Sequence, residues 1–404
     1  MRNILYITYD GLTDPLGQSQ ILAYLKRLSD LGNRIHIVSY EKRELFQKEE
    51  AAIREVVKKH GLQWTVLWYT KRPPVLSTML DIKRGYGLCS SMHQKHSFHI
   101  VHCRGYISAI IGEKLQKNFG LKFIFDMRGW WADEKKESGF WDKKIYRPVY
   151  AYFKKLEKLF FTRCDYAVSL TYKGKEEIIR QYNIDPEKIG VIPTCVDFEI
   201  FKSFKPEVRH QIRQELGISE KEKVFLYSGS IGGNYEPSIL VDMFKAYRQK
   251  HPDSFLLILS KDKLDEGLKD FLEKEKIERM AVLNAPFMQV TNYLQAADIG
   301  FIYYKISFST IGRSPTKMGE YWASGVPVIS FKQIGDLEVI LERYPGSGIL
   351  LTNEKETWAG QLENARFVNR NEMRAYAEDY FHISKGIAFY QAAYDLVSPV
   401  NVAV

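Results

Sequence analysis

The sequence predicts an α/β fold with two domains, each built on a parallel sheet. The chain has 404 residues, 45% of them hydrophobic, which is more than one hydrophobic core usually serves. Short β-branched runs alternate with longer amphipathic stretches, the pattern of βα units. This alternation stops in a polar, charge-rich stretch and then begins again, so one domain is expected on each side of that stretch.

The first domain is expected over residues 1–200. Its predicted strands are short apolar runs at residues 4–8, 35–40, 99–103, 122–127, 166–170 and 190–197. Helices are predicted over residues 20–32, with Gly32 as a C-terminal cap, over residues 108–120, and from near Thr171. Alternation of strands with helices is typical of a doubly wound parallel sheet.

The second domain is expected over residues 224–370. Its predicted strands are residues 224–230, 255–260, 280–285, 299–304 and 326–330. Residues 201–223 are interpreted as a linker region because they are polar and rich in charge. Residues 371–404 follow the last predicted strand and have helical spacing, so they are expected to form helices that cross back onto the first domain.

Composition limits the partners and the compartment. Lys and Arg total 58 against 49 Asp and Glu, and the net charge of +9 favours an anionic partner such as phosphate, nucleic acid or acidic lipid. The four cysteines lack CxxC spacing, so neither a disulfide framework nor a zinc site is predicted, and a cytoplasmic setting fits best. No segment has the pattern of a signal peptide or a membrane span, so any membrane contact is expected to be peripheral, on the inner face of the cell membrane.

The stretch SPTKMGEYWASGVPVIS, residues 314–330, predicts an anion-binding helix start. Pro315 suits the first helical turn. Free backbone N–H groups there, with Ser314, Thr316 and Lys317, would suit a diphosphate. Glu320 follows about one and a half helical turns after Ser314, where it could accept hydrogen bonds from ribose hydroxyls. The alternative is a capped core helix with a surface lysine.

Two glycine-containing turns follow predicted strands. YSGSIGGNYEPS, residues 227–238, includes Gly229 and Ser230, and a glycine turn lets the backbone approach a pyrophosphate closely. YDGLTDPLGQSQ, residues 9–20, is expected to be a loop in which Gly17 gives similar access. The second stretch lacks the GxGxxG fingerprint of dinucleotide sites. Either turn could equally need glycine for steric reasons alone.

The stretches VHCRGY and FDMRGWWADE place polar residues at the ends of two predicted strands. Open parallel sheets bind ligands at the carboxyl ends of their strands. The candidates for catalysis or acceptor binding are His102, Arg104, Asp126 and Arg128. Asp126 and Arg128 could instead be a structural pair, and His102 could be a satisfied core residue.

Residues 143–163 predict a basic amphipathic helix, with seven basic residues and one acidic residue. On a helical wheel the apolar side holds Ile145, Val149, Tyr152, Leu156, Leu159 and Phe160. The opposite side holds Lys144, Arg147, Lys154, Lys155 and Lys158. Such a helix can lie on an anionic bilayer, where each basic residue contributes about 1 kcal/mol. The alternative is an ordinary domain helix with a solvated lysine face.

Together these motifs resemble the retaining family 4 glycosyltransferases of the GT-B fold, and more narrowly a bacterial branch of surface-polysaccharide enzymes. The branch is recognised by DGLTDPLGQSQ, VHCRGY, FDMRGWWADE, VIPTCVD, YSGSIGGNY and SPTKMGEYWASGVPVIS. The resemblance covers nearly the whole chain. It implies two Rossmann-like domains that face each other across a cleft holding the donor. It also implies transfer of a sugar, with retention, from a nucleotide-diphosphate sugar to a glycan or polyprenyl-linked acceptor.

The resemblance also implies roles for single residues. Gly17 would lie near the donor diphosphate, Ser230 and the adjacent glycine turn opposite it, Lys317 on a phosphate and Glu320 on the ribose. Arg128 stands where many relatives have a histidine that reaches toward the donor sugar.

The chain departs from the family pattern at two places. Many relatives have a second glutamate eight residues before the ribose glutamate, where this chain has Gly312. They also tend to have an arginine and a lysine in the loop that corresponds to YSGSIGGNY, where this chain has Ser230 and Tyr235. Arg313 and Lys317 are the expected substitutes.

No DxD sequence occurs in the chain, so neither a metal ion nor another cofactor is expected. Basic side chains and helix dipoles would then stabilise the departing nucleoside diphosphate. Two other functions stay open: a nucleotide-sugar 2-epimerase or hydrolase on the same fold, and a non-catalytic basic binding protein. Nucleic acid is not expected as a partner, because the phosphate-type loops follow strand ends and do not form a continuous basic and aromatic face.

Overall fold

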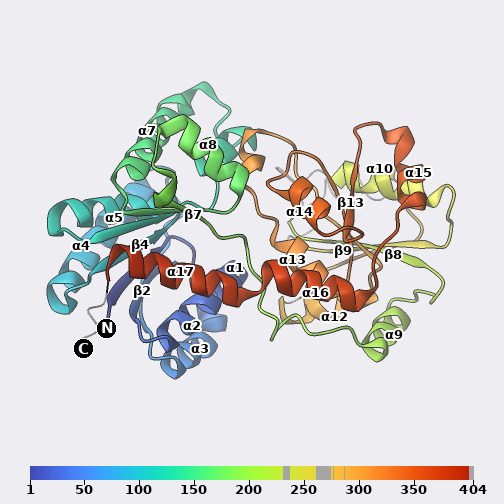
Figure 1. Cartoon of the computed structure of the whole chain (residues 1–404), viewed down its shortest axis with the longest axis horizontal. Coiled ribbons are helices and arrows are strands. Elements are labelled where there is room, and N and C mark those ends of the chain that lie inside the picture. Colours follow the sequence, from blue (N-terminus) through green and yellow to red (C-terminus); the bar gives the residue numbers. More distant parts are fainter. Residues whose placement is uncertain (231–236, 261–273, 276, 286, 400–404) are drawn as a thin grey trace. The chain divides into compact units, whose positions relative to one another are not determined.

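The structure, a computed structural model, describes residues 1–230, 237–260, 274–275, 277–285 and 287–399 (Figure 1). The chain forms two compact units. One comprises Met1–Cys195 together with Ile383–Val404, and the other comprises Val196–His382. Each unit is described by itself.

The first unit is built on a seven-stranded parallel sheet with the order β3-β2-β1-β4-β5-β6-β7. The strands are β1 (Asn3–Thr8), β2 (Arg34–Glu41), β3 (Gln63–Trp68), β4 (Ile100–Arg104), β5 (Lys122–Asp126), β6 (Tyr166–Ser169) and β7 (Ile189–Val191). The strand order reverses between β1 and β4, and ligands of such sheets bind outside the carboxyl ends of the strands at that point.

Helices join these strands. They are α1 (Pro15–Gly17), α2 (Ala23–Asp30), α3 (Arg43–Lys59), α4 (Leu76–His96), α5 (Gly105–Phe119), α6 (Trp131–Glu137), α7 (Arg147–Arg163) and α8 (Tyr172–Tyr182). The C-terminal helix α17 (Ile383–Val397) also belongs to this unit and packs against α2 (Figure 1). It contributes Ile387, Tyr390 and Tyr394 to a core shared with β1 and β2.

The second unit is built on a six-stranded parallel sheet with the order β10-β9-β8-β11-β12-β13. The strands are β8 (Lys223–Ser228), β9 (Ser254–Leu259), β10 (Met280–Leu283), β11 (Ile299–Phe301), β12 (Val328–Phe331) and β13 (Gly348–Leu351). The helices are α9 (Pro206–Glu215), α10 (Pro237–Arg248), α12 (Phe287–Ala296), α13 (Thr316–Ala323), α14 (Leu337–Arg343), α15 (Trp358–Asn364) and α16 (Arg370–Phe381).

The predicted α/β class with two parallel sheets is confirmed. Two strands, β3 and β13, and the long helices α3 and α4 were not predicted. The predicted strand over residues 190–197 is shorter, because β7 ends at Val191, two residues before Pro193.

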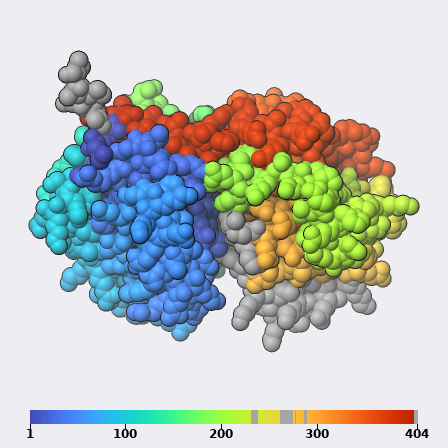
Figure 2. Space-filling view, turned by 90° about the horizontal axis from the view of Figure 1, so that it is seen from below, coloured from blue at the N-terminus to red at the C-terminus, as the bar shows by residue number. Residues whose placement is uncertain are grey.

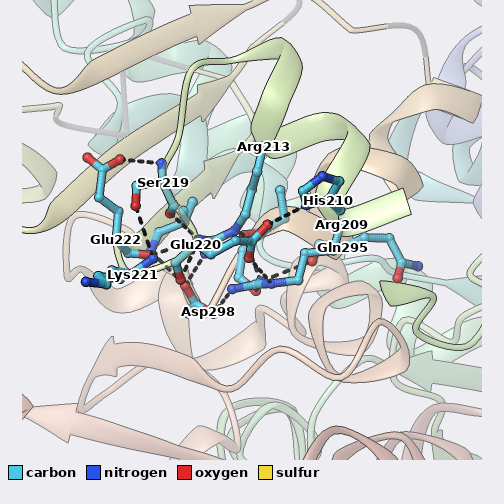
Figure 3. Close-up of polar contacts among 12 residues, drawn as sticks. Arg209, His210, Arg213, Ser219, Glu220, Lys221, Glu222, Gln295 and Asp298 are labelled. Carbon is cyan, nitrogen blue, oxygen red and sulfur yellow. Dashed lines mark hydrogen bonds and ion pairs between the residues drawn. The ribbon is translucent and has the colours of Figure 1, made fainter. Parts of the chain in front are cut away.

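Residues 201–223, expected to be a linker, belong to the second unit. They contain α9, which packs against α12, and Arg213 on α9 is fully buried (Figure 3). Its guanidinium donates to Asp298 Oδ2 at 2.7 Å and to the Ser219 and Glu222 carbonyls at 2.8 and 3.0 Å. Arg209 donates to Asp298 Oδ1 at 2.8 Å. The charged residues of this segment, Arg209 and Arg213, therefore bind it to the second unit through Asp298.

The surface of the first unit in the space-filling view is formed mainly by residues of its first hundred, coloured from blue to cyan (Figure 2). Among the described residues, no helix is both long enough and apolar enough to cross a bilayer.

Candidate functional site

The predicted anion-binding motif begins helix α13, as expected. Pro315 precedes the helix with φ −66° and ψ 108°, and Thr316 is the first helical residue. The Met318 amide donates to the Pro315 carbonyl at 3.0 Å and closes the first turn. Ser314 and Thr316 are half-buried at this turn.

Lys317 and Glu320 form an ion pair along α13. The Lys317 ammonium donates to Oε2 of Glu320 at 2.6 Å. The Glu320 side chain is only 4% exposed, whereas that of Lys317 is 29% exposed. Because an ammonium group has three N–H donors, Lys317 can hold Glu320 and a second anion at the same time.

A hydrogen bond ties α13 to the end of β8. Tyr321 is fully buried, and its hydroxyl accepts the Ser228 amide at 2.9 Å. Gly229 and Ser230 follow directly, and the Tyr227 hydroxyl donates to the Ser230 carbonyl at 2.5 Å. The start of the predicted glycine turn is thus held to the helix that carries Lys317.

The segment before α13 carries Arg313. Residues Phe308–Gly312 form a 3-10 turn that opens with a capping box. The Arg313 guanidinium lies 4.7 Å from the centre of the Tyr304 ring, within range of a cation–π interaction. Gly312 is buried at the end of the turn. Residues 231–236, and with them Tyr235, lie outside the described residues.

Gly17 lies in a helix and not in the predicted loop. Residues Pro15–Gly17 form α1, and the π-helical turn Gln18–Leu22 joins it to α2. A Cβ atom on Gly17 would lie 1.9 Å from the Gly11 carbonyl oxygen. Close packing between these two turns therefore requires glycine, whatever ligand the segment meets.

The turn before α1 is held by Glu41, a residue that the sequence analysis missed. Its fully buried carboxylate accepts the amides of Leu12 and Thr13 at 2.7 and 3.2 Å. It also accepts the hydroxyls of Thr13 and Ser39, each at 2.5 Å. The sequence feature that could have indicated this role is an acidic residue at the end of an apolar strand, since Glu41 is the last residue of β2.

The four candidates from the ends of β4 and β5 form one cluster in the first unit. Asp126 is fully buried, and Arg104 and His102 are 4% and 1% exposed. Asp126 Oδ2 lies 3.9 Å from Arg104 Nη1, and its Oδ1 lies 3.8 Å from Arg128 Nη1. One carboxylate therefore stands between two guanidinium groups.

Burial and neighbouring charges set the protonation states in this cluster. Burial alone would raise the pKa of the Asp126 carboxyl, but Arg128, His102 and Arg104 lower it to about 2. Burial lowers the pKa of His102, so its imidazole is neutral at pH 7. The two guanidinium groups face two carboxylates, that of Asp126 and that of Asp10 beside Arg104, so their charges balance.

Both arginines lie at sharp backbone turns. Arg128 has φ 58° and is followed by Gly129 with φ 108°, and Arg104 is followed by Gly105 with φ 76°. A non-glycine residue in the left-handed region costs about 1–2 kcal/mol, and such strain often accompanies functional sites. The strain at Arg128 therefore supports a role beyond packing.

Two tyrosines from α17 complete the cluster, and both were missed in the sequence. The Tyr390 hydroxyl donates to Asp126 Oδ2 at 2.8 Å, and the Tyr394 hydroxyl lies 2.8 Å from His102 Nδ1. The Tyr6 ring packs edge-on against His102, with 4.6 Å between the ring centres. His102 is thus enclosed in the core, but its Nε2 has no hydrogen-bond partner among the described residues and lies 3.8 Å from Asp126 Oδ2, so it is not the fully satisfied residue of the alternative interpretation.

Asp10 is a further residue that the sequence analysis missed. It lies two residues after the end of β1, and its Oδ2 lies 3.6 Å from Arg104 Nε. Its side chain is 51% exposed, in contrast to the buried Asp126. The sequence feature that could have indicated this residue is its position after the first strand, because β1 pairs with β4, which carries Arg104.

The basic stretch 143–163 forms a 3-10 turn and α7, but its faces differ from the prediction. The buried residues of α7 are Phe153, Glu157, Phe160 and Phe161. Ile145 and Tyr152, predicted on the packed side, are 76% and 54% exposed. Lys154, predicted on the solvated side, pairs with Asp133 at 2.8 Å and with Glu157 at 2.5 Å. The buried carboxylate of Glu157 draws this lysine inward.

Among the described residues, no group of three or more His, Cys, Asp or Glu side chains is arranged to hold a metal ion. The prediction that the reaction needs no metal remains a prediction.

Two family profiles match adjacent parts of the chain. The profile described as Glycosyltransferase Family 4 matches residues 17–200, and that described as Glycosyl transferases group 1 matches residues 208–380.

Curated relatives are distant in sequence. A D-inositol 3-phosphate glycosyltransferase of Arthrobacter sp. is 27% identical over 198 residues, 46% of this chain and 44% of the relative. A UDP-Gal:alpha-D-GlcNAc-diphosphoundecaprenol alpha-1,3-galactosyltransferase of Escherichia coli is 23% identical over 285 residues, 68% of this chain and 70% of the relative. The chain spans about half the length of the inositol phosphate glycosyltransferases that it matches.

Solved structures share the fold over the full length. HepE of Anabaena in complex with UDP-glucose has a TM-score of 0.70 at 14% identity, covering 97% of this chain and 100% of HepE. At that identity the likeness concerns the fold alone. With two parallel α/β sheets and matches to both family profiles, the chain belongs to the family 4 glycosyltransferases, enzymes of the GT-B fold.

Proposed function

We propose that this protein transfers a glycosyl group, with retention, from a nucleoside-diphosphate sugar to a glycan or lipid-linked acceptor. The pairing of Lys317 with buried Glu320 at the start of α13 carries this proposal. A lysine suits a diphosphate, and a buried carboxylate suits two neighbouring ribose hydroxyls. The UDP-glucose bound to HepE and the acceptor in the name of the Escherichia coli relative are consistent with it.

In this proposal the second unit binds the donor. The first amides of α13 and the positive end of its dipole attract the diphosphate, and Lys317 adds a full charge. Two further sets of groups are expected to donate hydrogen bonds to the phosphates: Arg313, Ser314 and Thr316 at the helix start, and Gly229 and Ser230 after β8. Glu320 is expected to accept from the ribose.

Catalysis is proposed to depend on the charge that develops on the leaving group. The bond from the anomeric carbon to the diphosphate oxygen breaks, and the bond from that carbon to the acceptor oxygen forms. The diphosphate gains negative charge as it leaves, so cationic groups already in place stabilise the transition state more than the ground state. We propose that these groups replace a metal ion.

The first unit is proposed to act on the acceptor side. Arg104 and Arg128 would bind polar or anionic groups of the substrates, while Asp126 holds both guanidinium groups in place. Asp10, the exposed carboxylate beside Arg104, is proposed to accept the proton of the acceptor hydroxyl. His102 and Tyr390 are positioning residues in this scheme, because each acts through Asp126.

A lipid-linked acceptor would require contact with a membrane. We propose that the exposed part of residues 143–163 makes such a contact through Ile145, Tyr152 and Lys155. An anionic inner leaflet would attract the basic side chains.

The donor is testable by thermal unfolding of the full chain with UDP, GDP, ADP, CMP and their sugars, because a ligand of the folded state raises its apparent stability. One nucleoside diphosphate is expected to raise the unfolding temperature, and Lys317→Ala and Glu320→Ala should each reduce that rise. Unchanged binding in both variants would overturn the proposed donor site. Rapid turnover of a nucleotide sugar to its epimer without acceptor would identify an epimerase instead.

The acceptor side and the metal are tested by transfer assays. Arg128→Ala is expected to lower turnover with a modest loss of donor affinity, and intact activity in this variant would contradict its role. Turnover should persist in excess EDTA. Loss of activity that added Mg²⁺ or Mn²⁺ restores would show that a metal takes part.

A further inference from the structure

Helix α7 carries buried polar side chains that the proposed reaction leaves without a role. The helix packs against α5, α6 and α8 within the first unit (Figure 1). Glu157 of α7 is fully buried, and its carboxylate accepts the hydroxyls of Tyr106 and Tyr182 and the ammonium of Lys154. Tyr106 binds Oε2 and Tyr182 binds Oε1. One carboxylate therefore connects α5, α7 and α8.

Lys154 connects this carboxylate to a second one. Its ammonium donates to Glu157 Oε1 at 2.5 Å and to Asp133 Oδ2 at 2.8 Å. The other oxygen of Asp133 accepts the Tyr150 hydroxyl at 2.7 Å. The Asp133 side chain is only 9% exposed. Because Asp133 belongs to α6, the connection extends to that helix, and we call Asp133, Lys154 and Glu157 the α7 network.

The donors of the α7 network keep their protons at neutral pH. Burial alone would lower the pKa of the Lys154 ammonium, but Glu157 and Asp133 raise it above its ordinary value. Burial raises the pKa of the Tyr106 hydroxyl well above its ordinary value. A buried carboxylate that loses one of these donors is left unsatisfied, and the chain can relieve this only by moving. The network is therefore sensitive to single substitutions.

The α7 network holds the first turns of two helices, and each of these helices follows a candidate arginine. Arg104 is the last residue of β4, and Tyr106, two positions later, is in the first turn of α5. Arg128 lies three positions before α6, and Asp133 is in the first turn of that helix. A shift of either helix start would therefore move the backbone that carries the arginine before it.

Aromatic packing links the same two helix starts to Asp126. The Tyr106 ring packs against Phe125 with 5.7 Å between the ring centres, and against Trp131 with 5.9 Å. Phe125 directly precedes Asp126 on β5, and Trp131 is the first residue of α6. The Tyr106 ring thus contacts the segments just before Asp126 and just after the Arg128 turn.

The turn at Arg128 needs support from its surroundings. Arg128 has φ 58° and Gly129 has φ 108°, and strained backbone persists only where the neighbouring structure holds it. On the strand side, the Met127 amide donates to the Val168 carbonyl at 3.2 Å. On the other side is α6, a helix of seven residues, whose own backbone hydrogen bonds hold it weakly. The hydrogen bonds of Asp133 supply an attachment on that side.

We propose that Asp133 and Glu157 are positioning residues for Arg128 and Arg104: linked by Lys154, they fix the starts of α6 and α5 and so hold both guanidinium groups beside Asp126. The roles of the two arginines rest on the proposed function. Both positioning carboxylates are buried and bound by protein donors, so they act through the arginines and not on a substrate. Helix α7 thereby has a function inside the first unit that is separate from its exposed face.

The first test observes the arginines directly by nuclear magnetic resonance of the full chain labelled with ¹⁵N-arginine. The Nε–H signals of Arg104 and Arg128 are assigned by their loss in Arg104→Ala and Arg128→Ala. Asp133→Asn is expected to shift or broaden the Arg128 signal, and Tyr106→Phe that of Arg104. Unchanged arginine signals in both variants would overturn the proposal, whatever reaction the protein catalyses.

Tyr182→Phe is the matched control. It removes the other tyrosine hydroxyl from Glu157, but Tyr182 ends α8, a helix that follows neither candidate arginine. Both arginine signals and the transfer rate should stay as in wild type, even if the free energy of unfolding falls. Changes in this variant as large as those in Tyr106→Phe would contradict the proposal, because any loss of a donor to Glu157 would then suffice.

The second test combines Asp133→Asn with Arg128→Ala in a transfer assay. Asp133→Asn alone is expected to lower the maximal rate about ten-fold to a hundred-fold, because a small displacement of a catalytic group is costly, with little change in the KM of the donor. In the Arg128→Ala protein the same substitution should have no further effect on the rate. A residue that only stabilises the fold would lower the rate by the same factor in both proteins, and that result would rule out positioning.

Folding and function are checked separately. A cooperative urea transition shows whether each variant is folded. If Asp133→Asn does not fold, Tyr150→Phe removes one of the two hydrogen bonds of Asp133 and should give a smaller change in the Arg128 signal. An unchanged signal in that variant would count against the proposal. Absence of transfer by the wild-type protein would remove the proposed function, and the arginine signals would still decide whether the α7 network positions Arg104 and Arg128.

Discussion

The Lys317 ammonium lies 2.6 Å from the Glu320 carboxylate, so the two side chains assigned to the donor hold each other before a donor arrives. The pair stabilises a carboxylate that is only 4% exposed. Removing the partner of a buried charge lowers the stability of the folded state. Substitutions at Lys317 therefore act on stability and on donor binding at once, and the two effects have to be separated.

Lys317→Ala is expected to weaken nucleoside diphosphate binding by about ten-fold to a hundred-fold, the range for loss of a charge-assisted hydrogen bond. It should also lower the free energy of unfolding by about 1–3 kcal/mol, because Glu320 is left buried without its cation. Calorimetric titration gives the first quantity, and urea unfolding gives the second.

The double variant Lys317→Ala with Glu320→Gln separates these effects. A neutral amide at position 320 needs no counter-charge, so most of the lost stability should return while donor affinity stays low. Recovery of affinity along with stability would mean that Lys317 acts only by neutralising Glu320.

Acid is expected to destabilise the first unit through Asp126. Its folded pKa of about 2 is below the ordinary value of 3.8. A carboxyl with a lowered pKa stabilises the folded state at pH values above 4, and this contribution is lost as the pH falls from about 4 to 2. The loss amounts to about 2 kcal/mol. Hydrogen exchange of peptides from β5, measured across this range, should show the change in wild type and not in Asp126→Asn.

The sequence predicted the repeating part of the fold well, because parallel strands are short apolar runs that the chain marks locally. It also predicted that polar residues would gather after β4 and β5. It missed Tyr390 and Tyr394, since nothing in a local pattern tells which strand ends a C-terminal helix will cover. It misplaced the faces of α7, because Glu157 sits at a core position where hydrophobicity alone predicts a leucine or a phenylalanine.

The interpretation of residues 201–223 as a linker failed for a related reason. The polar and charge-rich composition of this stretch predicted a linker, because arginine is usually exposed. In the fold both guanidinium groups bind Asp298, and Arg213 is fully buried. Whether Arg213 is buried or exposed depends on Asp298, a partner 85 positions away in the sequence.

A fragment of residues 196–382 is therefore expected to fold, and one of residues 224–382 is not. The longer fragment keeps α9 and its contacts with Asp298. The shorter one loses the hydrogen bonds of Arg209 and Arg213 to Asp298 and to the carbonyl of Ala296, and Asp298 keeps Arg370, at 3.7 Å. Circular dichroism and cooperative thermal unfolding distinguish the two. In the full chain, Arg213→Met should lower the stability of the second unit by about 1–3 kcal/mol, because the carbonyls of Ala296, Ser219 and Glu222 lose a donor while Asp298 keeps its hydrogen bond from Arg209. A cooperative transition in the shorter fragment would show that α9 is dispensable.

Gly17→Ala separates a steric role of this glycine from a role at the donor phosphate. The added Cβ atom would lie 1.9 Å from the Gly11 carbonyl oxygen, so the turn before α1 must move or unfold. We expect the free energy of unfolding of the first unit to fall by about 3 kcal/mol or more, with or without donor. The new Cβ atom would clash with backbone atoms, which cannot move aside as a flexible side chain can. Gly87→Ala is the matched control, as a Cβ atom there meets nothing within 4 Å and alanine favours the helix. A Gly17→Ala protein with normal stability and weakened donor binding would assign this glycine to the ligand instead.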